Sequence, residues 1–148
     1  MGRERVTLRA SAAATGSGTG PVFNALTDIV GGTLTIEDFH SALFLLDVTA
    51  VSGAAPTLNV FIQMEMPDGG WDDVVAFAQI LAAGRRIAVI IPNASSFTEG
   101  ISLDGGLSVS SVRGLPLRSS YRVKWTIGGV GPSFTFSVTA DFFASRRI

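Results

Sequence analysis

Residues 51–60, VSGAAPTLNV, return 76 positions later as residues 127–136, IGGVGPSFTF, and this repeated stretch decides the fold that we expect. Each copy has an apolar residue, a glycine-containing turn that ends in proline, and then alternating polar and apolar residues. Glycine and proline mark turns, and the alternation is typical of a half-buried strand. We therefore interpret each copy as the centre of an antiparallel hairpin, which predicts two hairpins, at residues 43–66 and 121–143.

The rest of the sequence also predicts strands separated by turns. Residues 42–51 are apolar on both faces at their start, as in a central strand that is covered on both sides. Pro67-Asp68-Gly69-Gly70 has the composition of a tight turn. Helical periodicity is nearly absent, and further short strands are predicted at residues 5–10, 22–26, 33–36, 71–80, 85–91 and 107–112. We expect an all-β, antiparallel β-sandwich or a β-barrel-like, jelly-roll-type single domain.

The N-terminal region has a different composition from the rest. Residues 11–20, SAAATGSGTG, contain no large apolar side chain. Such a segment cannot anchor itself in a core, so we interpret it as a loop or flexible arm. The expected organisation is an N-terminal strand and extended arm at residues 1–20, followed by a β-sandwich or barrel domain at residues 21–148.

The composition favours a folded chain that associates with other subunits. Apolar residues make up 47% of the chain and charged residues 16%, which excludes a disordered protein. The formal net charge of −1 gives no reason to expect a nucleic-acid partner. No apolar run approaches the roughly 20 residues of a membrane helix, so no membrane partner is expected. The charged start lacks an apolar signal core, and we expect a protein made and assembled inside a cell.

Few residues suggest catalytic or metal chemistry. The chain has no cysteine, which excludes disulfides and thiolate metal sites. Its single histidine, His40, could join Ser41 or Asp38 in a Ser/His/Asp arrangement, but neighbours in an extended chain do not face each other. We interpret His40 as a surface or loop histidine.

Four acidic residues surround the turn at residues 67–70, namely Glu65, Asp68, Asp72 and Asp73. Their oxygens could hold calcium, but the complete ligand series of a calcium loop is missing. A glycosidase pair would need two carboxylates at a defined separation across a cleft, which spacing in a loop cannot show. We favour a solvated turn, with an ion there as the alternative, and predict no catalytic, cofactor-binding or metal-binding residues and no cofactor.

Three aromatic residues, Trp71, Tyr121 and Trp125, could form a platform for a sugar ring. Aromatic residues on strands more often pack in cores and interfaces. Trp125 is in phase with Val123 and Ile127, so we assign it to the core. Trp71 follows a turn, and we expect it to be partly exposed.

Three segments together resemble small structural proteins of tailed bacteriophages. They are FLLDVTAVSGAAPTLNV at residues 44–60, the turn DGGW at 68–71, and RVKWTIGGVGPSFTFSV at 122–138. The resemblance spans about residues 43–143 and departs from the common pattern between residues 85 and 118. It implies a virion component with a β-sandwich-like or β-barrel-like fold and no enzymatic role.

The resemblance implies a capsid decoration protein that binds and stabilises the major capsid shell. Its expected partners are the major capsid protein and other copies of itself, since such proteins are often trimeric and grip the shell with a terminal arm. The expected location is the virion, assembled in the host cytoplasm. A head–tail connector or tail structural protein is the alternative. A carbohydrate-binding module that uses Trp71 and Tyr121 is a further alternative, and a hydrolase that uses the acidic turn is the least favoured.

Overall fold

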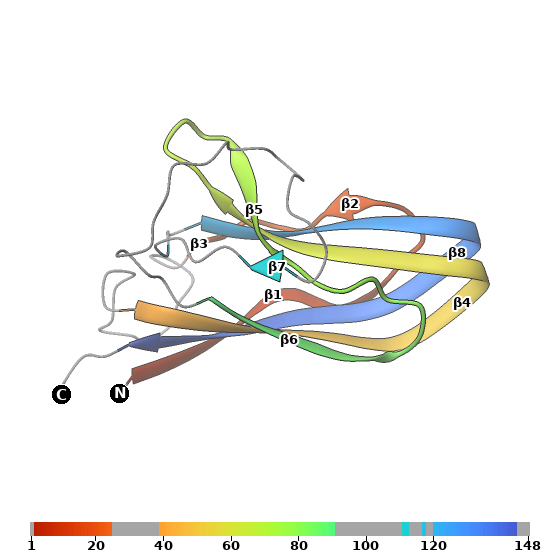
Figure 1. Ribbon diagram of the computed structural model, residues 1–148, viewed down its shortest axis with the longest axis horizontal. Coiled ribbons are helices and arrows are strands. Elements are labelled where there is room, and N and C mark those ends of the chain that lie inside the picture. Colours follow the sequence, from red (N-terminus) through yellow and green to blue (C-terminus); the bar gives the residue numbers. More distant parts are fainter. Residues whose placement is uncertain (1, 25–38, 91–110, 113–116, 118–119, 145–148) are drawn as a thin grey trace.

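The computed structural model describes residues 2–24, 39–90, 111–112, 117 and 120–144. All regular secondary structure in these residues is β-strand (Figure 1). The strands are β1 (Gly2–Ala14), β2 (Gly18–Thr19), β3 (Phe23–Asn24), β4 (Phe39–Glu65), β5 (Trp71–Ala76), β6 (Gly84–Ile90), β7 (Ser111–Val112) and β8 (Ser120–Ala144). Every pairing between them is antiparallel. The expected all-β, antiparallel, sandwich-like fold is therefore confirmed. The strand predicted at residues 33–36 and most of that at 107–112 lie outside the described residues.

The long strands β4 and β8 form the centre of the molecule. They pair with each other along almost their whole length, from Phe39 opposite Ala144 to Met64 opposite Tyr121. Both strands bend at the same place, so that the two-stranded ribbon folds over and supplies both layers of the sandwich (Figure 1). As a result, the first half of β4 pairs with the second half of β8 in one layer, and the remaining halves pair in the other.

The two repeated stretches form this bend, so the prediction of two separate hairpins at residues 43–66 and 121–143 is wrong. Neither strand pairs with itself across its glycine–proline stretch. Instead the copies face each other, with Ser52 opposite Ser133 and Ala54 opposite Val130. Register shifts on both sides of Ala54 mark bulges, which bend a strand. A glycine–proline stretch between two alternating segments is compatible with a hairpin turn, and equally with a bend at which one strand passes from one layer to the other.

The two copies have matching backbone conformations at the bend. Gly53 and Gly129 have φ angles of 109° and 112°, while Ala55 and Gly131 have 46° and 57°. A Cβ at Gly53 would lie 2.7 Å from the carbonyl oxygen of Gly131, and a Cβ at Gly129 would lie 2.8 Å from that of Ala55. The backbones of the two bends are therefore in direct contact, and a side chain fits at neither Gly53 nor Gly129.

Shorter strands widen both layers of the folded ribbon. The strand order is β6–β4–β8–β1 in one layer. In the other, β5 pairs with β4, β7 pairs with β5, and β2 and β3 pair with β8. The chain also crosses between the layers from β1 to β2 and from β5 to β6, on the side of the bend (Figure 1). The described strands form an open, folded sheet rather than a closed barrel.

The core lies between the layers and follows the alternation of β4 and β8. The inward residues of β4 are at most 2% exposed, and they are Ala42, Phe44, Leu46, Val48, Leu58, Val60, Ile62 and Met64. The Phe44 ring packs against Tyr121 and Phe142 of β8, with centroid distances of 6.4 Å and 6.2 Å, and these two rings lie 5.4 Å from each other. Burying one large apolar side chain contributes about 1.5–3 kcal/mol, so these rows dominate the stability.

Residues 11–20 lie on the sheet, so the expected loop or flexible arm is wrong for residues 11–14 and 18–19. Ala14 pairs with Phe134, and Gly18 pairs with Trp125. The Trp125 indole donates a hydrogen bond to the carbonyl oxygen of Gly16 at 2.9 Å, and a Cβ at Gly18 would lie 3.1 Å from its ring. The small residues are thus explained by close contact with Trp125 where the chain crosses between the layers.

The contact between the bends predicts different costs for two alanine substitutions. Gly53→Ala should lower the free energy of unfolding by about 2–4 kcal/mol, because the new Cβ meets backbone atoms. Gly131→Ala should cost only about 1 kcal/mol, because its positive φ is unfavourable for alanine but no atom lies within 4 Å of the new Cβ. Urea unfolding followed by tryptophan fluorescence measures both values. Equal losses in the two variants would contradict direct contact between the bends.

Candidate interaction surface

The structure places His40 at the surface. His40 is exposed near the start of β4, and the next residue, Ser41, is half-buried. Neighbouring side chains on a strand point to opposite sides. Asp38, the third member of the hypothetical arrangement, lies outside the described residues. The interpretation of His40 as a surface histidine is confirmed.

The predicted turn at residues 67–70 is present, but its acidic residues do not converge. The Gly70 amide donates a hydrogen bond to Oδ1 of the exposed Asp68 at 2.9 Å. Asp72 lies opposite Met64 and Asp73 opposite Gln63, so the two carboxylates are on opposite faces of the sheet. Both are buried, which makes the solvated-turn interpretation wrong for them. Within the described ranges, no group of three or more His, Cys, Asp and Glu residues is placed to hold a metal ion.

A polar chain that is buried except for the half-buried Arg122 connects β5, β4 and β8. Arg122 Nε donates to Oε1 of Gln63 at 2.7 Å, and Gln63 Nε2 donates to Oδ1 of Asp73 at 2.8 Å. Gln63 and Asp73 are fully buried. The neutral amide thus connects a cation to a carboxylate inside the protein, where such hydrogen bonds are stronger than in water. Sequence reasoning missed this chain, because Gln63 lies on the same side of the alternation as the polar residues Asn59 and Glu65 and gives no separate signal.

The three candidate aromatic residues do not form a common platform. Tyr121 is fully buried in the core and cannot contact a sugar. Trp125 is half-buried and packs against the core, where it meets the Phe136 ring edge-to-face at 5.6 Å, so its assignment to the core is confirmed only in part. Trp71 is half-buried, as expected, and the guanidinium of Arg122 lies 4.5 Å from its ring centre.

A buried arginine connects β1 to β8. Bulges on both sides of Arg9 interrupt the pairing of β1, and the side chain is only 8% exposed. Its guanidinium carbon lies 3.8 Å from the Phe136 ring centre and 4.7 Å from the Trp125 ring centre. Nη1 donates to the carbonyl oxygens of Phe136 and Ala12. Desolvation lowers the pKa of Arg9, yet an arginine remains charged throughout the usual pH range. These contacts attach β1 to the two layers at once.

Apolar side chains lie next to one another on the outer face of the β6–β4 pair. Val89 lies opposite Leu43, and Ile87 lies opposite Leu45, so these four side chains are neighbours on one face. Ile87 is 68% exposed and Val89 is 42% exposed, while the two leucines are half-buried. We call these four residues the β6 face. Contiguous exposed apolar side chains of this kind mark sites of protein–protein contact.

Charged residues border the β6 face on two sides. On one side, Arg5 of β1 forms a bidentate ion pair with Asp141 of β8, with Nε 2.8 Å from Oδ1 and Nη2 3.0 Å from Oδ2. The hydrogen bond from Arg5 lowers the pKa of Asp141. At the other end of the face, Arg85 of β6 lies opposite Asp47 of β4. An apolar centre with a charged border is the usual anatomy of an interface between proteins.

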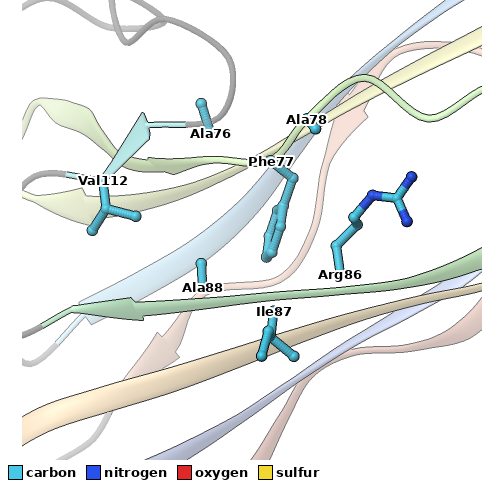
Figure 2. A pocket seen from close by; sticks show the side chains of 7 residues that line it. All are labelled: Ala76, Phe77, Ala78, Arg86, Ile87, Ala88 and Val112. Carbon is cyan, nitrogen blue, oxygen red and sulfur yellow. The ribbon is translucent and has the colours of Figure 1, made fainter.

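A pocket of about 240 Å³ opens on the other side of β6, between the two layers. Figure 2 shows Phe77 pointing toward β6, with Ala88 and Arg86 on the near side of that strand and Ile87 on the opposite side. Ala76, Ala78 and Val112 of β7 also line the pocket. The pocket is mainly apolar, and the only charged side chain among its lining residues is Arg86.

No protein-family model, curated protein or solved structure matches the chain. In the part of the chain that the structure describes, no helix is long and apolar enough to cross a membrane.

Substituting Arg9 tests its role as the connection between β1 and the core. Arg9→Ala should lower the free energy of unfolding by about 2–3 kcal/mol, because hydrogen bonds and cation–π contacts are lost together. Thr7→Ala, at an exposed position of the same strand, should change it by less than about 0.5 kcal/mol. Denaturant unfolding measures both variants, and a similar small change in the two would show that Arg9 does not stabilise the fold.

The Arg5–Asp141 pair predicts a pH dependence. Because the folded-state pKa of Asp141 is lowered, the contribution of the pair is complete above the unfolded-state pKa of about 3.9 and is lost as the pH falls through the lower folded value. Asp141→Asn should therefore flatten the fall of unfolding free energy between about pH 5 and pH 2, measured at low ionic strength. Arg5→Gln should flatten the same range, and an unchanged fall in both variants would refute the pairing.

Proposed function

We propose that this chain is a non-catalytic structural component of a tailed-bacteriophage virion, and specifically a capsid decoration protein that binds and stabilises the major capsid shell. The observation that carries the proposal is the β6 face, an apolar surface with a charged border on a rigid sheet. Rigid sheet surfaces suit contact with another folded protein, since little ordering is needed on binding.

The sequence resemblance supports the same proposal from a different direction. Two of the three resembling segments, residues 44–60 and 122–138, are the paired and bent parts of β4 and β8. The third, residues 68–71, is the turn that leads into β5. The segments that resemble phage structural proteins therefore form one connected scaffold rather than scattered pieces.

The position of residues 11–20 changes how this protein would bind a shell. A flexible arm was the expected means of attachment, but residues 12–14 pair with β8, and Gly16 and Gly18 contact Trp125. Releasing them would uncover Trp125 and break part of the β1–β8 ladder. We therefore assign attachment to the β6 face.

A head–tail connector or tail protein remains the second proposal within the same class, because the β6 face would serve there equally well. The carbohydrate-binding alternative loses one of its two proposed contacts, since Tyr121 is fully buried. Only the location of the protein in a particle separates decoration from a connector role.

Co-expression with the major capsid protein of the same genome tests the proposal. We expect the protein to co-sediment with assembled shells in a sucrose gradient, and cryo-electron microscopy of those shells to show density repeated over the whole surface. In complete particles, density confined to the tail axis would support the connector alternative. Absence of the protein from both shells and tails would refute a virion role.

A pair of variants tests the assigned surface. Val89→Asp places a charge on the β6 face and should reduce shell co-sedimentation at least about tenfold, which corresponds to about 1.4 kcal/mol. Val130→Asp is the matched control, because Val130 is 76% exposed at the bend, outside the β6 face. Attachment through the β6 face would be contradicted if both variants lost shell binding equally, or if neither variant lost it.

A further inference from the structure

The strand β6 has a free edge in the described part of the chain. It pairs with β4 along its whole length, from Ala42 opposite Ile90 to Val48 opposite Gly84. On its other side, no strand of the described residues pairs with it. A strand edge with unpaired backbone groups readily accepts another strand.

The two edges of this layer are protected very differently. At the opposite edge, β1 presents the exposed charged side chains Arg3 and Arg5, and charges of this kind prevent edge-to-edge pairing. β6 also begins with two charges, Arg85 and Arg86, but its centre carries the exposed Ile87. The centre of β6 therefore lacks the protection that β1 has.

We propose that two copies of this chain associate by antiparallel pairing of their β6 edges around a two-fold axis at Ile87. In this register Ile87 lies opposite Ile87 of the second copy, and Arg85 lies opposite Val89 of the second copy. The two Ile87 side chains form an apolar cross-strand pair, which favours pairing. The two Arg85 residues are four positions apart along the strands, about 13 Å, so their repulsion is weak in water.

The pocket side of β6 is also self-complementary in this register. Arg86 lies opposite Ala88 of the second copy, so a long side chain faces a small one. Figure 2 shows that Arg86 and Ala88 point to the same side of β6, toward the pocket beside Phe77. The apolar stem of Arg86 can therefore cover the pocket of the second copy while its guanidinium stays in water.

Edge pairing leaves the outer surface of the sheet open and joins the β6 faces of two copies into one. The joined face would offer the shell a binding surface of twice the size. This part of the inference rests on the proposed function. A two-fold axis produces a dimer, in contrast to the trimer expected from the resemblance.

Sedimentation velocity of the purified protein, without any shell, tests the association. We expect a monomer–dimer equilibrium in the wild-type protein and an at least tenfold weaker dimer in Ile87→Lys, because lysine at a strand edge opposes pairing. Val130→Lys should dimerise like the wild type. A monomeric wild type at submillimolar concentration, a trimer, or a dimer that Ile87→Lys does not weaken would overturn the proposal.

Single cysteines test the register, because the natural chain has none. Under mild oxidation I87C should form a disulfide-linked dimer, since directly opposite Cβ atoms lie about 4.5–5.5 Å apart. R85C alone should not crosslink, but a mixture of R85C and V89C should form the mixed dimer. Efficient crosslinking of R85C alone, or none in I87C, would refute the register.

The variant Val89→Asp separates this inference from the proposed function. In the dimer its carboxylate lies opposite Arg85 of the second copy, so we expect dimerisation to be retained while shell binding falls. A dimer without shell binding in the wild-type protein would refute only the virion proposal. Shell binding by a protein that stays monomeric would refute only the β6 pairing.

Discussion

The contact between the two bends is the constraint on which the rest of the structure depends. Gly53 and Gly129 let the backbones of β4 and β8 approach each other where both strands pass from one layer to the other. With a side chain at either position, one strand would have to move away from the other, and the pairing on both sides of the bend would lose its register. The bend thus aligns the inward rows of the two layers, and it also sets where Trp125 and Phe136 meet.

This arrangement makes the fold dependent on contacts between distant parts of the chain. β4 and β8 are separated by more than fifty residues, and each layer takes half of its central pair from each strand. Among the described strands, β1 likewise pairs only with β8, at the other end of the sequence. Proteins dominated by such non-local pairing fold slowly, because the chain must close long loops before the contacts stabilise it. Neither layer has a complete set of partners until β8 is in place.

The strands and the inward rows could be predicted from the sequence, because alternation at Phe44, Leu46 and Val48 directly reports burial on one face. Their connection at the bend could not, since a glycine–proline stretch fits a hairpin and a corner equally well. The small residues at 11–20 look unanchored in sequence, but the absence of a side chain at Gly18 lets this segment lie close against Trp125. The β6 face could not be predicted, because it depends on which strand lies beside β4. The pairing of Ile87 with Leu45 joins strands that are distant in sequence, and the local residue pattern does not show it.

The pairing of Gly2 with Ala144 has a mechanical consequence. The first residue of β1 and the last residue of β8 lie together at one end of the β1–β8 ladder, far from the bend (Figure 1). A pulling force applied between these two ends would break the backbone hydrogen bonds between β1 and β8 one after another, starting at the pair of Gly2 and Ala144. The first hydrogen bonds would yield at low force, and the opening would meet its first strong resistance at Arg9, where the guanidinium is held between two aromatic rings.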